Sequence, residues 1–325
     1  MKISIANKSK IITPSLFSGY DACINPYVGC SYGCSYCYVR FFIKDEQHEW
    51  GDFVRIRTHI KDKLPKELHK NEISLPDGKI IDQKTGKPKK KYKKVPITEA
   101  RLVMGTMTDP YQPIERKYRL TRETLTQLTA TDTPQFKKVG IFTRSPIVLD
   151  DIDLIKKLPK ARVHFTITPM PPEARRIIEP YSSMVSRRWD TVKKLKEAGI
   201  RVHCNISPII PLLSEEFIED FVQKTIELEV DEYFVDPLQP YKQSFESFQI
   251  ACQKLNIDWP KIARIMQNKD LYLDWKADFF EKWNNERLKH NQVPNQLPIW
   301  CDHENKIWID MRNMQQMDHR NYNDN

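Results

Sequence analysis

The chain of 325 residues carries a net charge of +9, and 40% of its residues are hydrophobic. This length suits one α/β barrel with an appended segment, and the hydrophobic content is enough for a real core. No run of about 18 apolar residues occurs, so the sequence predicts no membrane-spanning helix. The positive charge is compatible with a polyanionic partner but is weak support alone, because many soluble enzymes are basic.

The cysteines argue against a secreted, disulfide-bonded protein. There are seven of them, an odd number, and three lie within the eight residues from Cys30 to Cys37. The first residues, Met1 to Lys8, also lack the apolar segment of a signal peptide. We therefore expect the protein to work in a reducing cytoplasm, without a membrane anchor.

Two segments near the N-terminus depart from a regular pattern. Residues 1–19 are polar with scattered apolar positions and are predicted to form an irregular leader, followed by a first strand from Asp21 to Tyr27. Residues 61–97 contain turn sequences and the dense basic run Lys89–Lys94. We interpret 61–97 as a basic segment that interrupts the regular pattern. It is either a solvated hairpin with no function of its own or a flap that contacts phosphates.

After Thr98, apolar segments typical of buried strands alternate with helix-like segments. The expected strands are Leu102–Thr106, Val139–Thr143, Arg162–Thr168, Arg201–Ser207 and Tyr233–Asp236. The expected helices are Thr121–Thr129, Leu149–Leu158, Arg187–Ala198 and Glu215–Glu229. Together with the first strand, this rhythm predicts an α/β fold with a parallel sheet over residues 20–240.

Residues 241–325 lose the strand–helix rhythm and are predicted to form a C-terminal helical extension with a small hairpin. The expected helices are Gln243–Leu255, Trp259–Gln267 and Leu271–Leu288. The hairpin is expected to pair Leu297–Cys301 with Lys306–Met311.

Several of the predicted strands are polar on one face and apolar on the other, because successive side chains of a strand alternate. His164, Thr166 and Thr168 share one face of their strand, and His203, Asn205 and Ser207 share one face of the next. An α/β barrel that only packs its interior carries branched apolar side chains there. We therefore expect the apolar faces to pack on helices and the polar faces to line a lumen that holds a ligand.

The sequence from Cys30 to Cys37, Cys-Ser-Tyr-Gly-Cys-Ser-Tyr-Cys, is the most informative motif about chemistry. Thiolates hold iron–sulfur clusters, usually four per cluster, so three ligands would leave one iron of a [4Fe–4S] cube open. A zinc site is the alternative interpretation. It needs a fourth Cys or His, and none lies close by in sequence.

The spacing of Cys30, Cys34 and Cys37 resembles the cluster loop of the radical S-adenosylmethionine (radical SAM) superfamily. The flanking residues and the segments Gly105–Glu115 and Ser207–Pro211 are similar to its spore photoproduct lyase-related branch. The resemblance implies that the sheet curls into a partial (β/α)6 barrel of the TIM type. It also implies two cofactors, a [4Fe–4S] cluster and S-adenosylmethionine (SAM), and reductive cleavage of SAM to a 5′-deoxyadenosyl radical.

The resemblance also suggests which residues bind the cofactors, with the three cysteines as the cluster ligands. Tyr36 resembles the aromatic position near the adenine, and Gly105 with Thr106 corresponds to the strand end that meets the methionyl amine. Arg144 stands where this branch typically has a lysine, and it could hold the carboxylate with forked geometry. The further SAM candidates are Thr108, Thr166, Thr168, Arg188 and Ser207, with a surface ion pair as the alternative role of Arg188.

We expect a radical SAM enzyme, supplied by an external electron donor such as flavodoxin or ferredoxin. Its substrate is unidentified. Against the family pattern, residues 61–97 look like a basic insertion. This insertion and the family's DNA-repair lyase favour a nucleic acid. The alternatives are a radical SAM enzyme acting on a protein side chain or small metabolite, and a non-catalytic metal-cluster module that binds nucleic acid.

The catalytic residues are not identified by the sequence. Related lyases use a cysteine as hydrogen-atom donor between the cluster loop and the second strand, but no cysteine occurs here between Cys37 and Cys204. Cys204 itself is expected on the outer face of its strand, as a small core residue.

Overall fold

The computed structural model describes residues 1–6, 9–15, 17, 19–43, 45, 47–81, 88–238 and 242–292. The chain forms two compact units. The first comprises Met1–Ser31, Gly51–Phe165 and Thr191–Val202, and the second Tyr32–Trp50, Thr166–Asp190 and the chain from His203 onward. The hairpin expected at Leu297–Met311 lies outside the described residues.

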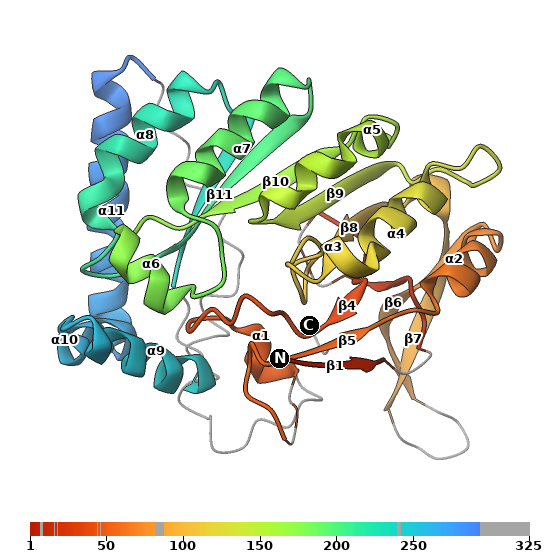
Figure 1. The fold of residues 1–325 in the computed structure, drawn as a ribbon, viewed down its shortest axis with the longest axis horizontal. Coiled ribbons are helices and arrows are strands. Elements are labelled where there is room, and N and C mark those ends of the chain that lie inside the picture. Colours follow the sequence, from red (N-terminus) through yellow and green to blue (C-terminus); the bar gives the residue numbers. More distant parts are fainter. Residues whose placement is uncertain are drawn as a thin grey trace. The chain divides into compact units, whose positions relative to one another are not determined.

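A mostly parallel sheet runs through the first unit (Figure 1). Its strands, in spatial order, are β10 (Arg162–Ile167), β9 (Lys138–Thr143), β8 (Arg101–Met104), β3 (Ala22–Ile24) and β2 (Thr13–Pro14). The strands from β10 to β3 pair in parallel, and the edge strand β2 pairs antiparallel to β3. Leu102, Ile141 and Val163 are fully buried on these strands, as expected for apolar runs in a parallel sheet. The predicted α/β fold is confirmed.

Short helices cover the first unit. α4 (Leu120–Leu128) packs against both α2 (Ile60–Leu68) and α5 (Ile152–Ile155). The other helical elements are η1 (Ile97–Glu99), α3 (Glu115–Tyr118) and η2 (Pro146–Asp151). The helix predicted over Leu149–Leu158 is therefore two shorter elements. The first begins at Pro146. The side chain of Ser145, just before it, accepts a hydrogen bond from the backbone N–H of Ile147.

The N-terminal leader is not irregular, contrary to the prediction. β1 (Lys2–Ile5) pairs in parallel with β5 (Phe53–Ile56), and β5 pairs antiparallel with β4 (Tyr27–Val28). Ile3 packs on a buried cluster that includes Tyr27 and Val54. A strand of four residues has too little pattern to be read from sequence, because its stability comes from the strand with which it pairs.

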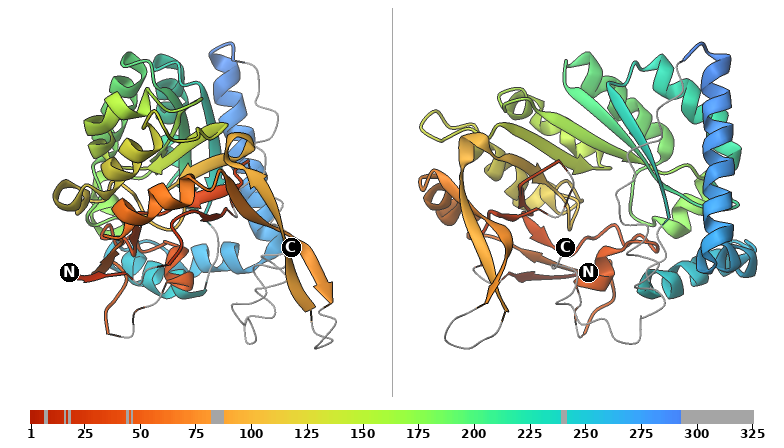
Figure 2. Two further views of the ribbon diagram at one scale, coloured as in Figure 1. Left: turned by 90° about the vertical axis from the view of Figure 1, so that its right-hand side faces the viewer. Right: turned by 180° about the vertical axis from the view of Figure 1, so that it is seen from behind.

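Residues 61–97 contain α2 followed by an antiparallel pair, β6 (Glu72–Ile81) and β7 (Pro88–Pro96). Figure 2 shows these strands side by side as an extended ribbon. The predicted hairpin is therefore present. Helix α2 was missed because Pro65 interrupts its pattern, although Leu64 and Leu68 are buried on one side.

The second unit pairs β11 (Arg201–Ile209) in parallel with β12 (Glu232–Pro237). Its helical elements before the C-terminal part are α1 (Val39–Phe42), α6 (Pro172–Ile178), α7 (Val185–Glu197), η3 (Glu215–Phe217) and α8 (Ile218–Glu227). β10, α7 and β11 each pass from one unit to the other along the chain. Helix α6 has no counterpart among the predictions.

The C-terminal helical extension is confirmed. It consists of α9 (Lys242–Lys254), α10 (Trp259–Gln267) and α11 (Lys269–Lys289), the long blue helix in Figure 1. α11 packs on α8 and α10, whereas α9 packs on α1 and α6. None of the helices in the described ranges combines the length and the apolarity needed to cross a membrane.

Trp283 should be the residue that holds α11 in place. It is 2% exposed, and its ring lies on Phe279 and beside Tyr233. Trp283→Ala should lower the free energy of unfolding by about 3–5 kcal/mol, since it removes a large buried side chain and leaves a cavity. Chemical denaturation measures this. Lys282→Ala is the control: Lys282 precedes Trp283 on the same helix and forms an exposed ion pair with Asp278, so its loss should change the free energy of unfolding by less than about 1 kcal/mol.

Candidate active site

The three motif cysteines lie in the loop where the chain passes from the first unit to the second. Cys34 is buried, and Cys30 and Cys37 are half-buried. The backbone N–H of Cys37 donates to the carbonyl of Cys34, at 3.2 Å. Gly29 precedes the loop with φ of +87°, and a Cβ there would lie 2.7 Å from the carbonyl oxygen of Phe53. The loop thus begins at a backbone position that only glycine fits.

The buried amide of Gln112 supports the first cysteine. Its Oε1 accepts the N–H of Ser31 at 2.8 Å, and its Nε2 donates to the carbonyl of Gly29 at 3.2 Å. The hydroxyl of Thr108 donates to the same carbonyl at 2.6 Å. Both residues on either side of Cys30 are therefore held by the segment that follows β8. The structure places Thr108, a SAM candidate from the sequence, in this support, and Gln112 was not singled out from the sequence.

The end of β8 is shaped by a second glycine. Gly105 has φ of +86°, and a Cβ would lie 2.5 Å from the carbonyl oxygen of Phe142. Beside it, the hydroxyl of Thr106 accepts a hydrogen bond from Asn25, at 3.3 Å. The buried carboxyl of Asp109 accepts the backbone N–H of Arg144 at 2.9 Å, and burial raises the pKa of Asp109. Gly105, Thr106 and Arg144 thus lie on neighbouring parallel strand ends of the first unit.

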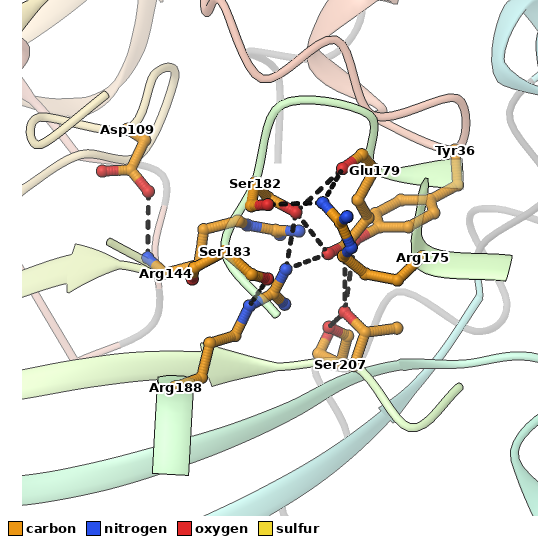
Figure 3. A network of polar contacts seen from close by, with 10 residues as sticks. Tyr36, Asp109, Arg144, Arg175, Glu179, Ser182, Ser183, Arg188 and Ser207 are labelled. Carbon is orange, nitrogen blue, oxygen red and sulfur yellow. Dashed lines mark hydrogen bonds and ion pairs between the residues drawn. The ribbon is translucent and has the colours of Figure 1, made fainter. Parts of the chain in front are cut away.

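In the second unit, Tyr36 belongs to a buried polar network around Glu179 (Figure 3). The carboxylate of Glu179 accepts hydrogen bonds from the hydroxyls of Tyr36, Thr168 and Ser182, the last two at 2.7 and 2.9 Å. Arg188 forms an ion pair with it, and both side chains are 0% exposed. Tyr36 and Thr168 were SAM candidates from the sequence, and the structure shows both hydroxyls bonded to Glu179. Glu179, at the end of α6, was not singled out from the sequence.

The two terminal nitrogens of the Arg188 guanidinium differ in their hydrogen bonding. Its Nη2 donates to Glu179 and to the hydroxyl of Ser182, and its Nε donates to the carbonyl of Ser183, as Figure 3 shows. Its Nη1 is buried and has no acceptor among the described residues. The pair with Glu179 is fully buried, so the surface ion pair considered from the sequence is not what the structure shows. An unsatisfied buried guanidinium nitrogen indicates a place for an acceptor atom of a ligand.

The other two candidates of the second unit lie on strand ends. Thr166 is half-buried on β10. The carbonyl of Ser207, on β11, accepts the hydroxyl of Thr168 at 2.9 Å, and the hydroxyl of Ser207 contacts Asp236 at 3.4 Å. Ser207 therefore connects the Glu179 network to the carboxyl end of β12.

The predicted alternation of strand faces is visible in the first unit. His164 of β10 stacks on Phe142 of β9, with ring centroids 4.2 Å apart. The hydroxyl of Tyr20 hydrogen-bonds to Nε2 of His164 at 2.6 Å, and Gly140 leaves room for it, because a Cβ there would lie 2.2 Å from that hydroxyl. Val163 and Phe165, on the opposite face of β10, are fully buried.

A basic side chain lies near the thiols of the cysteine loop. Arg40, one turn after Cys37, lies near the thiols: burial lowers the pKa of Arg40, and Cys37, Glu49 and Cys34 oppose that shift. A neighbouring cation favours thiolates. Within the described part of the chain, no three His, Cys, Asp or Glu side chains converge on one point as ligands of a single ion. In a cluster each thiolate binds a different iron, so such convergence is not required.

Comparisons with known proteins agree with this chemistry. The sequence profile of the Radical SAM superfamily matches residues 24–225. The protein MJ0683 of Methanocaldococcus jannaschii is 32% identical over 211 residues, which cover 64% of this chain and 68% of the relative. Rv2578c of Mycobacterium tuberculosis is 25% identical over 204 residues, 59% of this chain and 50% of the relative. The chain thus spans about half the length of that mycobacterial protein.

Among solved structures, a spore photoproduct lyase mutant with bound AdoMet and dinucleoside spore photoproduct has a similar fold. The TM-score is 0.53 at 14% identity, covering 78% of this chain and 66% of that chain. At this identity the likeness concerns the fold alone. The profile match extends over more than half of the chain and includes all three motif cysteines. The chain therefore belongs to the radical SAM superfamily.

Proposed function

We propose that the protein is a radical SAM enzyme that holds a [4Fe–4S] cluster on Cys30, Cys34 and Cys37 and acts on a nucleic acid. The observation that carries the proposal is the cysteine loop itself, which is held by Gln112 on both sides of its first cysteine and by Glu179 just before its last. When bound, the cluster supplies the electron that cleaves SAM to methionine and a 5′-deoxyadenosyl radical. For the fold, we propose that the strands form the partial six-stranded barrel typical of the superfamily.

The chain's own residues would bind and orient SAM. Arg188 Nη1 is a buried donor without an acceptor among the described residues, which suits the carboxylate of SAM or a ribose oxygen. Arg144 is the second candidate for the carboxylate, on a backbone fixed by Asp109. The remaining SAM candidates are Tyr36, Gly105, Thr106, Thr108, Thr166, Thr168 and Ser207. Of these, Thr108 and Thr168 orient neighbouring backbone in the structure.

A nucleic-acid substrate is supported by the hairpin β6–β7. Lys91, Tyr92, Lys93 and Lys94 are all exposed on β7, and Tyr92 is 54% exposed. Lysines interleaved with an exposed aromatic ring suit phosphates and a stacked base. The similar lyase structure contains a dinucleoside photoproduct, so this fold can take a nucleotide substrate. The reaction would differ from that of the lyase, because no cysteine occurs between Cys37 and Cys204.

The alternative substrate is a protein side chain or a small metabolite. Lys91 pairs with Asp77 at 3.1 Å and Lys94 with Glu72 at 2.5 Å, so part of the hairpin's charge is already neutralised. If the substrate is a protein side chain or a metabolite, the lysines of the hairpin serve only to keep the protein soluble. Either substrate requires an external electron donor, for which a flavodoxin or ferredoxin is the proposed partner.

The first prediction concerns the cluster. Anaerobically purified protein should contain about four iron and four sulfide per chain, with the absorption of a [4Fe–4S] cluster. Replacing Cys30, Cys34 and Cys37 together with Ala should abolish both, since no ligand set remains. Cys204→Ala is the control and should retain them. Full iron content in the triple variant would contradict the ligand assignment.

The second prediction concerns the cofactor. Arg188→Lys keeps a cation beside Glu179 and removes the second guanidinium arm. Binding of S-adenosylhomocysteine, measured by calorimetry, should weaken by about 1.5–3 kcal/mol, the range for a hydrogen bond to a charged group. Arg187→Lys, exposed on the same helix, is the matched control and should bind as the parent does. If Arg188→Lys binds normally and Arg144→Ala does not, Arg144 alone holds the carboxylate.

The third prediction concerns the hairpin. Replacing Lys91, Lys93 and Lys94 with Ser should make the log–log salt dependence of single-stranded DNA binding shallower by about 2, at about 0.7 per lost phosphate contact. Cluster content should not change.

The matched control removes the same charge elsewhere in the first unit, with Ser at the exposed positions Lys156, Lys157 and Lys194. Equal slopes for both triple variants would show that the hairpin is not the contact. A parent protein that binds neither DNA nor RNA would favour the protein or metabolite substrate.

A further inference from the structure

The paired strands β11 and β12 present one polar, partly open face. Register places His203 opposite Glu232 and Asn205 opposite Phe234, and opposed residues of paired strands point to the same side. The other side carries Cys204, Ile206 and Val235, which are buried and apolar. On the polar face His203, Glu232 and Phe234 are only half-buried, so this face is the one expected to meet a ligand.

Asn205 is a buried polar residue whose amide oxygen has no hydrogen-bond partner among the described residues. Its side chain is 3% exposed, and its Oδ1 accepts no hydrogen bond from any described residue. A buried amide oxygen without a partner destabilises the folded protein, because it has given up its hydrogen bonds to water. Its neighbour on the same face, His203, is by contrast 3.8 Å from the carboxylate of Glu232. Asn205 thus has the character of a binding residue and not of a core residue.

Two neighbours complete the chemistry around Asn205. Phe234 lies directly opposite, half-buried, with its ring edge-on to His203 at 5.1 Å. Asp236 lies two residues further along β12, about 7 Å nearer the carboxyl end. Its carboxyl is 3.4 Å from the hydroxyl of Ser207. Burial raises the pKa of Asp236 to about 6, although Ser207 and Lys276 oppose the shift.

We propose that Asn205, Phe234 and Asp236 form a subsite for one nucleobase of the substrate. The amide of Asn205 can donate to and accept from the edge of a base, as Asn does with adenine. Asp236 can accept from an exocyclic amine or a ring N–H, and Phe234 supplies a flat apolar surface. The inference rests on the proposed nucleic-acid substrate and adds to it a site that reads the base, whereas the hairpin lysines contact phosphates.

The base that enters this subsite must be unstacked. A face within paired strands cannot receive a base that is still in a duplex, so the substrate is single-stranded or its base is turned out of the helix. The adenine of SAM is the other nucleobase available to the enzyme. An assay with both ligands separates these two sources.

The variant Asn205→Leu tests the subsite, because it keeps the size of the side chain and removes its polar atoms. The probe is a fluorescein-labelled single strand of about 12 nucleotides, within the usual range of single-strand sites. An abasic strand with the same phosphates serves for comparison. The parent should bind the base-containing strand about 10-fold more tightly than the abasic strand, and Asn205→Leu should remove that difference. Asp236→Ala should reduce it in the same direction.

Stability gives the second readout. Asn205→Leu should leave the melting temperature unchanged or raise it, because the replaced amide oxygen was unsatisfied. Cys204→Ala, on the opposite face of the same strand, should lower the melting temperature and keep the preference for the base-containing strand. A large drop in melting temperature for Asn205→Leu would show that Asn205 is structural and would overturn the proposal.

The outcomes also separate this inference from the proposed function. If the parent binds both strands equally well, the subsite is wrong while nucleic-acid binding stands. If it binds neither strand, the nucleic-acid substrate itself is wrong. If Asn205→Leu weakens S-adenosylhomocysteine about 10-fold and leaves the base preference intact, the residue belongs to the cofactor's adenine, and the substrate subsite is refuted.

Discussion

The buried carboxylate of Glu179 is the charge on which the second unit's part of the site depends. A carboxylate with no exposure would cost several kcal/mol if it stood alone. Arg188, equally buried, neutralises it, and the hydroxyls of Tyr36, Thr168 and Ser182 satisfy its oxygens. Removal of any one partner leaves a buried group uncompensated. Glu179 therefore holds three places of the chain in one arrangement: Tyr36 before the last cysteine, Thr168 after β10 and Arg188 near the start of α7. Loss of one of these contacts disturbs the others.

In the first unit, the neutral side chain of Gln112 satisfies buried polar groups of the backbone beside Cys30. The backbone around Cys30 forms no regular secondary structure, so the carbonyl of Gly29 and the N–H of Ser31 need side-chain partners. The amide of Gln112 supplies one donor and one acceptor, which matches one carbonyl and one N–H. Gln112 and Arg188 differ in whether a polar atom of the side chain lacks a partner. The amide of Gln112 bonds to the backbone on both sides of Cys30, whereas Nη1 of Arg188 has no acceptor among the described residues.

The sequence predicted what is local and missed what is not. The strand expected at Val139–Thr143 is found at Lys138–Thr143, because a buried parallel strand is a continuous apolar run. The cysteine loop was recognisable because its three thiols lie within eight residues. Gln112 and Glu179 were missed because their partners lie 81 and 143 positions away, and nothing in the neighbouring residues indicates the contact.

Buried polar groups with and without hydrogen-bond partners affect the stability of this protein differently. Glu179 is fully satisfied by protein atoms, so it stabilises one conformation. Arg188 Nη1 and Asn205 Oδ1 have no partner within the described part of the chain, so each lowers the stability of the fold. A group that is destabilising alone and held rigidly by its neighbours is already oriented when a ligand arrives, and little reorganisation opposes binding. The ion pair with Glu179 fixes the guanidinium plane of Arg188, and the pairing of β11 with β12 fixes the backbone of Asn205. In the two proposed sites, the stability lost at these atoms is thus the cost of holding a binding group in one orientation.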